Sequence, residues 1–225
     1  MPPFAPNDVT EDLRVVRLIK ADHNAVVNFM QKDFRRFEPL MGSLNMTEAE
    51  SEEFFHKTVE YCLEYPISFA MKRSDGAIVG IILNTYLTRP KEGEEEASVE
   101  LEHLKANHLV DIVDALRAQI WEKLDKSIVK VVDLSILSVD SAYARRGIAS
   151  ALIDELDEKK LKAEGVQGIV SELTNTKSQQ LLKTRYGYKS IFEIVYGDWV
   201  GREGRQIFDC SKFNSDRVIL AFKPF

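Results

Sequence analysis

The sequence contains few of the residues that build metal sites and disulfide frameworks: two cysteines and four histidines in 225 residues. Cys62 and Cys210 lie far apart, no Cys-x-x-Cys pair occurs, and the histidines show no ligand spacing with the cysteines. Structural metal sites and disulfide scaffolds need clustered cysteine and histidine ligands. The sequence therefore predicts neither kind of scaffold and no metal site.

Long apolar runs are also missing. No stretch approaches the ~20 consecutive apolar residues that a membrane-spanning helix requires. The first thirteen residues have neither the basic region nor the apolar run of a secretory signal. The sequence therefore predicts a cytoplasmic protein without a membrane partner.

An excess of positive charge, the usual mark of nucleic-acid binding, is absent too. Thirty Lys and Arg residues stand against 36 Asp and Glu residues, which gives a formal net charge of -6. Such a balance argues weakly against a nucleic-acid partner and suits a cationic ligand, although solubility is the simpler explanation of the net charge. The apolar fraction of 44% and the charged fraction of 29% are typical of a globular protein.

Strand and helix patterns alternate along the chain. Alternating or continuous apolar runs predict strands at 13–19, 68–73, 77–87, 130–139, 168–174, 188–199 and 217–225. Apolar residues three to four apart predict helices at 22–34, 46–66, 104–126, 147–165 and 177–185. An acidic run at 88–102 predicts a solvated loop. We expect one domain at 11–225, with a loose segment at 1–10 and a sheet covered by helices on both faces.

Local signals mark several helix ends. Pro39 is expected to end the first helix, because proline lacks an N–H and clashes with the preceding turn. Thr47 and Glu50 have the spacing of a capping box at the start of the second helix. Gly165 is a plausible C-cap for the helix at 147–165.

Residues 144–150, Ala-Arg-Arg-Gly-Ile-Ala-Ser, stand where a predicted strand turns into a helix. The first N–H groups of a helix have no partner inside it, and the helix dipole adds partial positive charge there. Glycine and small residues let a phosphate approach the backbone, and two arginines can pair with more phosphate charge. The corner therefore predicts an anion cradle, with a plain tight turn and solvated arginines as the alternative.

The strand and corner together resemble the acetyl-CoA-binding motif of the GNAT superfamily of N-acetyltransferases. That motif, Gln/Arg-x-x-Gly-x-Gly/Ala, falls on residues 144–149, with Ala144 in place of the usual Gln or Arg. The resemblance implies an α/β (α+β) fold with a mixed, largely antiparallel central sheet, and acetyl-CoA as co-substrate. It implies that the cofactor lies against Leu137, Ser138, Val139, Arg145, Arg146, Gly147, Ile148, Ala149 and Ser150.

Three further stretches resemble one branch of that superfamily, the invertebrate arylalkylamine (dopamine) N-acetyltransferases. Residues 29–44 resemble an early-helix signature that ends in Asp-Glu-Pro-Leu, a long helical insert is expected at 104–126, and residues 174–199 resemble the branch's short helix and following strand. Phe37 stands where the branch often has the first acid of that signature. The amine preference of this chain can therefore differ from that of the branch.

Glu38 is the candidate general base for acyl transfer to an amine. An ammonium group has no lone pair, so the amine must lose a proton, and a carboxylate can accept it directly or through a water. Glu38 precedes Pro39 and is expected just past a helix end among apolar residues, where both the dipole and burial raise its proton affinity. The alternative is an ordinary surface glutamate.

The proton donor for the leaving thiolate is less clear from the sequence. The resemblance places Ser178 near the thiol, and many GNAT enzymes carry a tyrosine where this chain has Leu182 or Lys183. Tyr186 and Tyr188 are alternative acids, although a structural role is the simpler interpretation. Phe34, Phe37, Phe54 and Phe55 line either an aryl pocket or the plain core.

The resemblance implies acetyl transfer from acetyl-CoA to the primary amine of a small arylalkylamine, such as dopamine, tyramine, octopamine or serotonin, by a monomer or homodimer. Two alternatives remain open. One is the same chemistry on a polyamine or amino acid, or with a longer acyl donor. The other is a CoA-binding domain without turnover.

Overall fold

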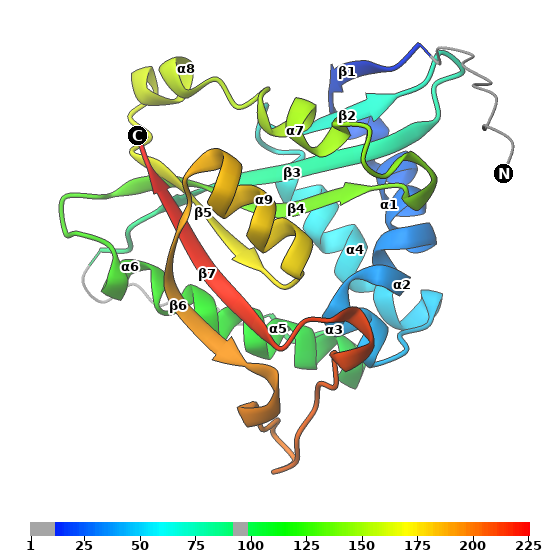
Figure 1. Ribbon diagram of the computed structural model, residues 1–225, viewed down its shortest axis with the longest axis vertical. Coiled ribbons are helices and arrows are strands. Elements are labelled where there is room, and N and C mark those ends of the chain that lie inside the picture. Colours follow the sequence, from blue (N-terminus) through cyan, green and yellow to red (C-terminus); the bar gives the residue numbers. More distant parts are fainter. Residues whose placement is uncertain (1–11, 92–98) are drawn as a thin grey trace, which may run out of the picture.

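A computed structural model describes residues 12–91 and 99–225 of the chain (Figure 1). The predicted loose segment at 1–10 lies outside the described residues, as do residues 92–98 of the predicted acidic loop. Within the described ranges, no helix combines the length and apolar composition that crossing a membrane requires.

The described strands form one seven-stranded sheet in the order β1-β2-β3-β4-β5-β7-β6. All neighbouring strands run antiparallel except β4 and β5, which run parallel. The prediction of a mixed, largely antiparallel sheet is confirmed, and β4 occupies its centre, as its apolar sequence predicts. The strands are β1 (Arg14–Arg17), β2 (Phe69–Lys72), β3 (Ile78–Thr88), β4 (Lys130–Val139), β5 (Gly168–Leu173), β6 (Lys189–Val195) and β7 (Arg217–Pro224).

Helices pack on both faces of this sheet, as predicted (Figure 1). The first face carries α1 (His23–Phe29), α4 (Glu48–Cys62) and α5 (Leu104–Arg117), and their apolar residues form one core cluster with β3, β5 and β7. The second face carries α7 (Ile148–Ile153), α8 (Glu158–Ala163) and α9 (Thr176–Tyr186), which form a second cluster. The remaining helical segments are η1 (Lys20–Asp22), η2 (Met30–Phe34), α2 (Arg35–Phe37), α3 (Pro39–Ser43), α6 (Ile120–Lys123), η3 (Ser141–Tyr143), η4 (Tyr196–Asp198) and η5 (Ser211–Phe213).

Two helices predicted as continuous are each broken in two, so those predictions were wrong in detail. The segment at 104–126 tightens after α5 through a bond from the Gln119 N–H to the Leu116 carbonyl, and α6 follows. The segment at 147–165 stops at Ile153, because the Asp157 carboxylate accepts from two backbone N–H groups and starts α8 instead. An aspartate side chain that competes for backbone donors favours a new helix start over a continuing helix.

The first helix changes its hydrogen-bond pattern instead of ending after one regular run. Residues Met30–Phe34 form a π-helical turn, and α2 continues to Phe37. Glu38 then adopts the extended backbone expected before proline, with φ -68° and ψ 127°. Pro39 therefore ends one helix, as predicted, but it also occupies the first position of α3, where proline is well tolerated. The predicted capping box of Thr47 and Glu50 starts α4.

Candidate active site

The central feature is a fork between β4 and β5. The two parallel strands pair at two positions, Val132 with Ile169 and Asp133 with Val170, within the described ladder. Beyond these pairs β4 continues along β3 and β5 continues along β7, so their arrows run apart in Figure 1. Along residues 134–139, the backbone edge of β4 that faces the fork is therefore not paired with the backbone of β5. This edge offers backbone N–H and C=O groups to an extended ligand.

The glycine corner lies at the open end of that fork. Gly147 is the N-cap of α7 and has φ +79°, in the left-handed region, and Arg145 before it has φ +61°. A Cβ placed on Gly147 would meet no atom within 4 Å, so the space above the turn is open. The backbone N–H groups of the first turn of α7 have no acceptor within the helix. The corner thus provides positive charge and an open approach for an anion.

The predicted cofactor residues lie on two adjoining segments, the end of β4 and the start of α7. Leu137, Ser138 and Val139 pair with β3 by one backbone edge only. Arg145, Arg146 and Gly147 are exposed, whereas Ile148 and Ser150 are buried and Ala149 is half-buried. The arginines can therefore reach a ligand through their side chains. Residues 148–150 can contact a ligand mainly through their backbone.

Glu38 lies next to the end of β5. Its Oε2 accepts a 2.7 Å hydrogen bond from the Met41 backbone N–H in α3. Its Oε1 is buried and has no hydrogen-bond partner among the described residues. The Thr174 side chain, just past β5, lies close enough to the carboxyl group to influence its pKa. The structure thus brings residue 38 to the fork across more than a hundred residues of sequence.

Burial is the main cause that raises the pKa of Glu38 above its ordinary value. The hydrogen bond from the Met41 N–H opposes this rise, as do the nearby Thr174 side chain and Leu40 backbone. The sequence predicted the direction correctly. Glu38 lies just past the end of α2, as predicted, but it is also the N-cap of α3, and the start of α3 favours its negative charge. The two helix ends oppose each other, so burial is the cause that raises the proton affinity.

The connection between β6 and β7 covers the Glu38 carboxyl group and α3. The Cys210 thiol donates to the Pro39 carbonyl at 3.3 Å. A Cβ on Gly42 would collide with the Phe213 ring, so this loop and α3 are in direct contact. Burial and, to a smaller extent, the Glu38 charge raise the pKa of Tyr196, whose hydroxyl donates to the Thr174 carbonyl. The sequence did not identify this loop as part of the site.

Ser178 lies in the first turn of α9, with its hydroxyl bound locally. The hydroxyl donates to the Asn175 carbonyl at 2.8 Å, and the side chain is half-buried. Asn175 itself caps the helix by accepting from the Lys177 N–H. Because β5 leads directly into α9, Ser178 lies a few residues past the same strand end as Thr174. Its predicted role near the thiol stays a prediction.

The alternative acids lie on the second face of the sheet. Tyr186 donates to the Ser150 carbonyl and to Asp154, which ties α9 to α7. Tyr188 is 3 % exposed and its hydroxyl has no partner among the described residues. Leu182 is fully buried in the core. Tyr186 thus braces the helix of the glycine corner, as the structural interpretation of the sequence predicts.

The four phenylalanines divide between core and surface. Phe55 is fully buried and contacts Phe34 and Phe54 at ring-centroid distances of 6.1 and 6.0 Å. Phe37 is 52 % exposed and lies 5.9 Å from the Arg36 guanidinium. Phe55 is therefore plain core, and Phe37, next to Glu38 in sequence, is the one of the four that a ligand can most readily reach.

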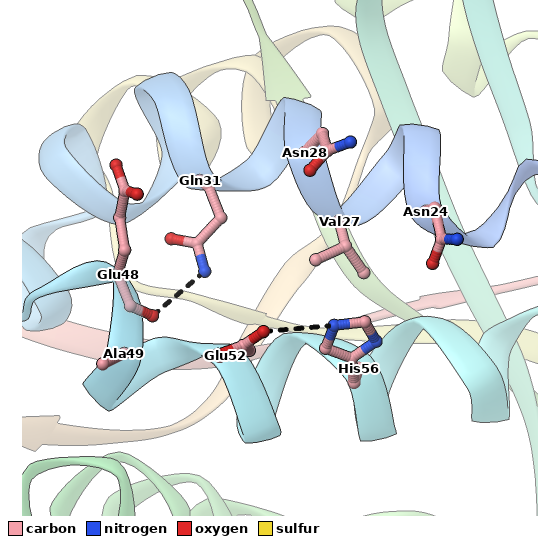
Figure 2. Close-up of a pocket in the computed structure, with 8 residues that line it drawn as sticks. All are labelled: Asn24, Val27, Asn28, Gln31, Glu48, Ala49, Glu52 and His56. Carbon is pink, nitrogen blue, oxygen red and sulfur yellow. Dashed lines mark hydrogen bonds and ion pairs between the residues drawn. The ribbon is translucent and has the colours of Figure 1, made fainter.

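A pocket of about 420 Å³ lies elsewhere, between α1 and α4 (Figure 2). Figure 2 shows polar side chains of α1 and η2 facing those of α4, with Gln31 bonded to the Glu48 carbonyl and Glu52 near His56. None of the predicted site residues lines it. The fork is the candidate site, because it combines an open backbone edge, an anion corner and a buried carboxylate.

A buried charge cluster at the closed end of the fork was not predicted from the sequence. Arg117 of α5 binds Asp133 of β4 at 2.6 Å and Glu172 of β5 at 3.2 Å. Burial and the nearby Asp133 raise the pKa of Glu172 to about 7, although Arg117 opposes the rise. Single acidic residues inside the apolar strands "KVVDLSILSV" and "GIVSELT" were the available signal, because a charge in a central strand must find a buried partner.

The raised pKa of Glu172 predicts a pH dependence of stability. Between about pH 4.5 and 7 the folded chain holds a proton on Glu172 that the unfolded chain has lost, so stability falls as pH rises through this window. Glu172→Gln removes this titrating group. The decrease in the free energy of unfolding between pH 5 and pH 8 should therefore be smaller by about 1–3 kcal/mol than in the wild type. Urea unfolding at several pH values measures this difference. The surface variant Glu193→Gln, which also removes an arginine's partner, should show the same change of unfolding free energy with pH as the wild type. If Glu172→Gln also showed the wild-type change, the prediction would be contradicted.

The arrangement of sheet, fork and corner defines the GNAT fold, which confirms the resemblance at the level of fold. No protein-family profile matches the sequence, and no curated protein matches it. Solved structures do match. The fold is similar to that of arylalkylamine N-acetyltransferase 2 from Aedes aegypti, with a TM-score of 0.80, 21% identity and coverage of 95% of this chain and 99% of that chain.

Two further structures show how widely the fold is used. A Drosophila melanogaster polyamine N-acetyltransferase that forms N-acetylagmatine has a TM-score of 0.75 at 17% identity, over 95% of this chain and 100% of that one. The C-terminal condensation domain of Ebony, solved with β-alanyl-dopamine, has a TM-score of 0.73 at 15% identity, over 96% and 100%. At such identities the shared fold does not select an amine, so the substrate must be argued from this chain's own residues.

Proposed function

We propose that this chain is an acetyl-CoA-dependent N-acetyltransferase that acts on the primary amine of a small arylalkylamine of the dopamine, tyramine, octopamine or serotonin type. The observation that carries the proposal is the placement of Glu38. A buried carboxylate with a raised pKa lies at the end of β5, on a fork whose open end is the glycine corner. Acyl transfer to an amine needs a base and a thioester bound in a fixed position, and the fork has room for both.

Acetyl-CoA fits the corner and the fork. The pyrophosphate would accept from the backbone N–H groups of residues 147–150 and pair with Arg145 and Arg146, because Gly147 leaves the approach open. The pantetheine arm would extend along the backbone of Leu137, Ser138 and Val139, which β5 leaves uncovered. When bound, acetyl-CoA supplies an activated acetyl thioester.

The chain's own groups then act on protons. A cationic amine enters beside the Glu38 carboxylate, which accepts the amine's proton, directly or through a water. The neutral amine would form the C–N bond to the acetyl carbon, and the C–S bond would break. The nitrogen would then lose its second proton, which the thiolate takes up, so that the amide and the CoA thiol leave. The proposal assigns Ser178 to the neighbourhood of that thiolate, where its hydroxyl would donate a hydrogen bond after leaving the Asn175 carbonyl. The transfer is direct, with no acyl group on the protein, and the proposed compartment is the cytoplasm.

Two features of this chain favour an amine that is both aromatic and cationic. Phe37 is exposed and adjacent to Glu38 in the sequence, and its ring would present an apolar, polarisable face to an aryl group. The net charge of -6 favours the approach of a cationic amine in general. Because Phe37 replaces an acid of the branch signature, the ring of the substrate contributes more of the binding here.

We therefore predict that dopamine or tyramine has a higher kcat/KM than spermidine, agmatine or lysine. Release of the CoA thiol, measured with a panel of these amines, tests the prediction. Phe37→Ala should reduce the ratio of kcat/KM for tyramine to kcat/KM for spermidine. Phe54→Ala, which changes a core-packed ring, should leave this ratio unchanged. A clear preference for spermidine or agmatine would assign the chain to polyamine-type substrates. Tight CoA binding without thiol release for any amine would indicate a binding domain.

A further inference from the structure

The Arg117 cluster joins three elements around the closed end of the fork. Arg117 of α5 donates from Nη2 to Asp133 Oδ2 at 2.6 Å and from Nε to Glu172 Oε1 at 3.2 Å. The Asp133 side chain is 0 % exposed, the Glu172 side chain 6 % and the Arg117 side chain 31 %. Ser135 adds a hydrogen bond to Asp133 Oδ2 at 2.9 Å. One guanidinium thus links adjacent strands through two carboxylates.

This linkage coincides with the point at which β4 and β5 part. Asp133 belongs to the last backbone pair of the two strands, and Glu172 lies two residues beyond its partner Val170 on β5. The Ser171 hydroxyl donates to the Leu134 carbonyl at 2.8 Å, one residue past that pair. Side chains therefore replace the backbone ladder where the ladder ends. Thr174, which neighbours Glu38, lies two residues beyond Glu172 on the same strand path.

We propose that Arg117 is a positioning residue that fixes where β4 and β5 separate, and so sets how far the acyl-bearing arm of the donor enters the fork relative to Glu38. The inference rests on the proposed function, because it takes the arm to lie in the fork. Arg117 touches neither the donor nor the amine in this scheme, and it acts through the two strands that it joins.

The electrostatics explain why an arginine is needed at this point. Two buried carboxylates on adjacent strands repel each other and, without a partner, would separate or take up protons. The planar guanidinium presents donors at fixed angles to both carboxylates. It therefore fixes the distance between the two carboxylates and also neutralises one of their charges. Burial opposes the charge on Arg117, but Asp133 and Glu172 outweigh it and raise the pKa of the guanidinium, so the positive charge persists at every working pH.

The test separates the two ends of the donor. Acetyl-CoA contains the arm, whereas adenosine 3′,5′-bisphosphate keeps a phosphorylated nucleoside end without it. Calorimetric titration of Arg117→Met, which keeps an unbranched apolar stem but removes the guanidinium and its charge, should show acetyl-CoA affinity reduced ~10-fold or more and bisphosphate affinity within twofold of wild type. Arg202→Met is the matched control, because Arg202 also binds two carboxylates, Glu100 and Asp111 of α5, but at the surface. It should change neither affinity.

Glu172→Gln covers the case in which Arg117→Met does not fold. At pH 8, where the Glu172 carboxyl group has lost its proton, the substitution keeps the size of the side chain and removes one charge of the linkage. It should then weaken acetyl-CoA in the same selective way, by a smaller factor. Equal weakening of both ligands would show a general structural role and overturn the proposal. Unchanged acetyl-CoA affinity in both variants would overturn it as well. Wild-type chain that binds neither ligand would remove the proposed function itself, and with it this inference.

Discussion

Glu38→Gln is expected to lower kcat/KM at neutral pH by about 100-fold or more, the usual contribution of a positioned general base. Glutamine keeps the size of the side chain and can still accept the hydrogen bond from the Met41 N–H, so α3 keeps its cap. It cannot accept the amine's proton. Because burial raises the pKa of Glu38, the wild-type rate should rise with pH as the carboxyl group loses its proton.

The pH dependence of the loss distinguishes a base from a positioning group. As pH rises, more of the amine arrives neutral and needs no base, so the deficit of Glu38→Gln should shrink. Acetyl-CoA affinity should hardly change, because the role is confined to the proton. The control Glu52→Gln alters a glutamate in the pocket between α1 and α4 and should behave as wild type. A deficit of equal size at every pH would assign Glu38 a positioning role, and activity within twofold of wild type would remove it from the mechanism.

Gly147→Val is expected to weaken CoA binding by about 10-fold or more. The branched side chain would project into the approach that the pyrophosphate uses, and φ +79° is unfavourable for a β-branched residue, so the turn would also distort. The loss of one or two charge-assisted hydrogen bonds accounts for a change of this size. Calorimetric titration of the folded variant with CoA measures it.

Gly165→Val is a matched control for the strain of the backbone. Gly165 has the same φ of +79°, and a Cβ added there would, as at Gly147, meet no atom within 4 Å, but Gly165 lies after α8, away from the corner. Both variants should lose a similar amount of stability, and only Gly147→Val should lose affinity for CoA. Equal affinities in the two variants would place the phosphates elsewhere.

Local features of the site were predictable from the sequence because they depend on neighbouring residues. The glycine corner is one example: the strand β4, the turn at Gly147 and the start of α7 follow from residues 130–150 alone. The extended backbone of Glu38 is another, because Pro39 imposes it. The central position of β4 follows from its continuous apolar sequence.

The features that the sequence did not predict depend on distant residues. The parting of β4 and β5 lies just beyond the pairing of Asp133 with Val170, where Arg117 binds Asp133, and no local pattern encodes these contacts. The start of α3 at Glu38 was not predicted, because α3 is five residues long and has no periodic signal of its own. The covering loop between β6 and β7 likewise reaches Pro39 through Cys210, 171 residues away in the chain.

The most direct measurement of the central claim is the stoichiometry of thiol release in a single turnover, with the chain in excess over acetyl-CoA. Direct transfer predicts no release of CoA thiol without an amine, and one thiol per N-acetylated tyramine when tyramine is added, with no acetyl group on the protein by intact mass. A burst of thiol with an acetylated protein in the absence of amine would contradict direct transfer. Bound acetyl-CoA that stays intact with every amine would contradict the proposed activity.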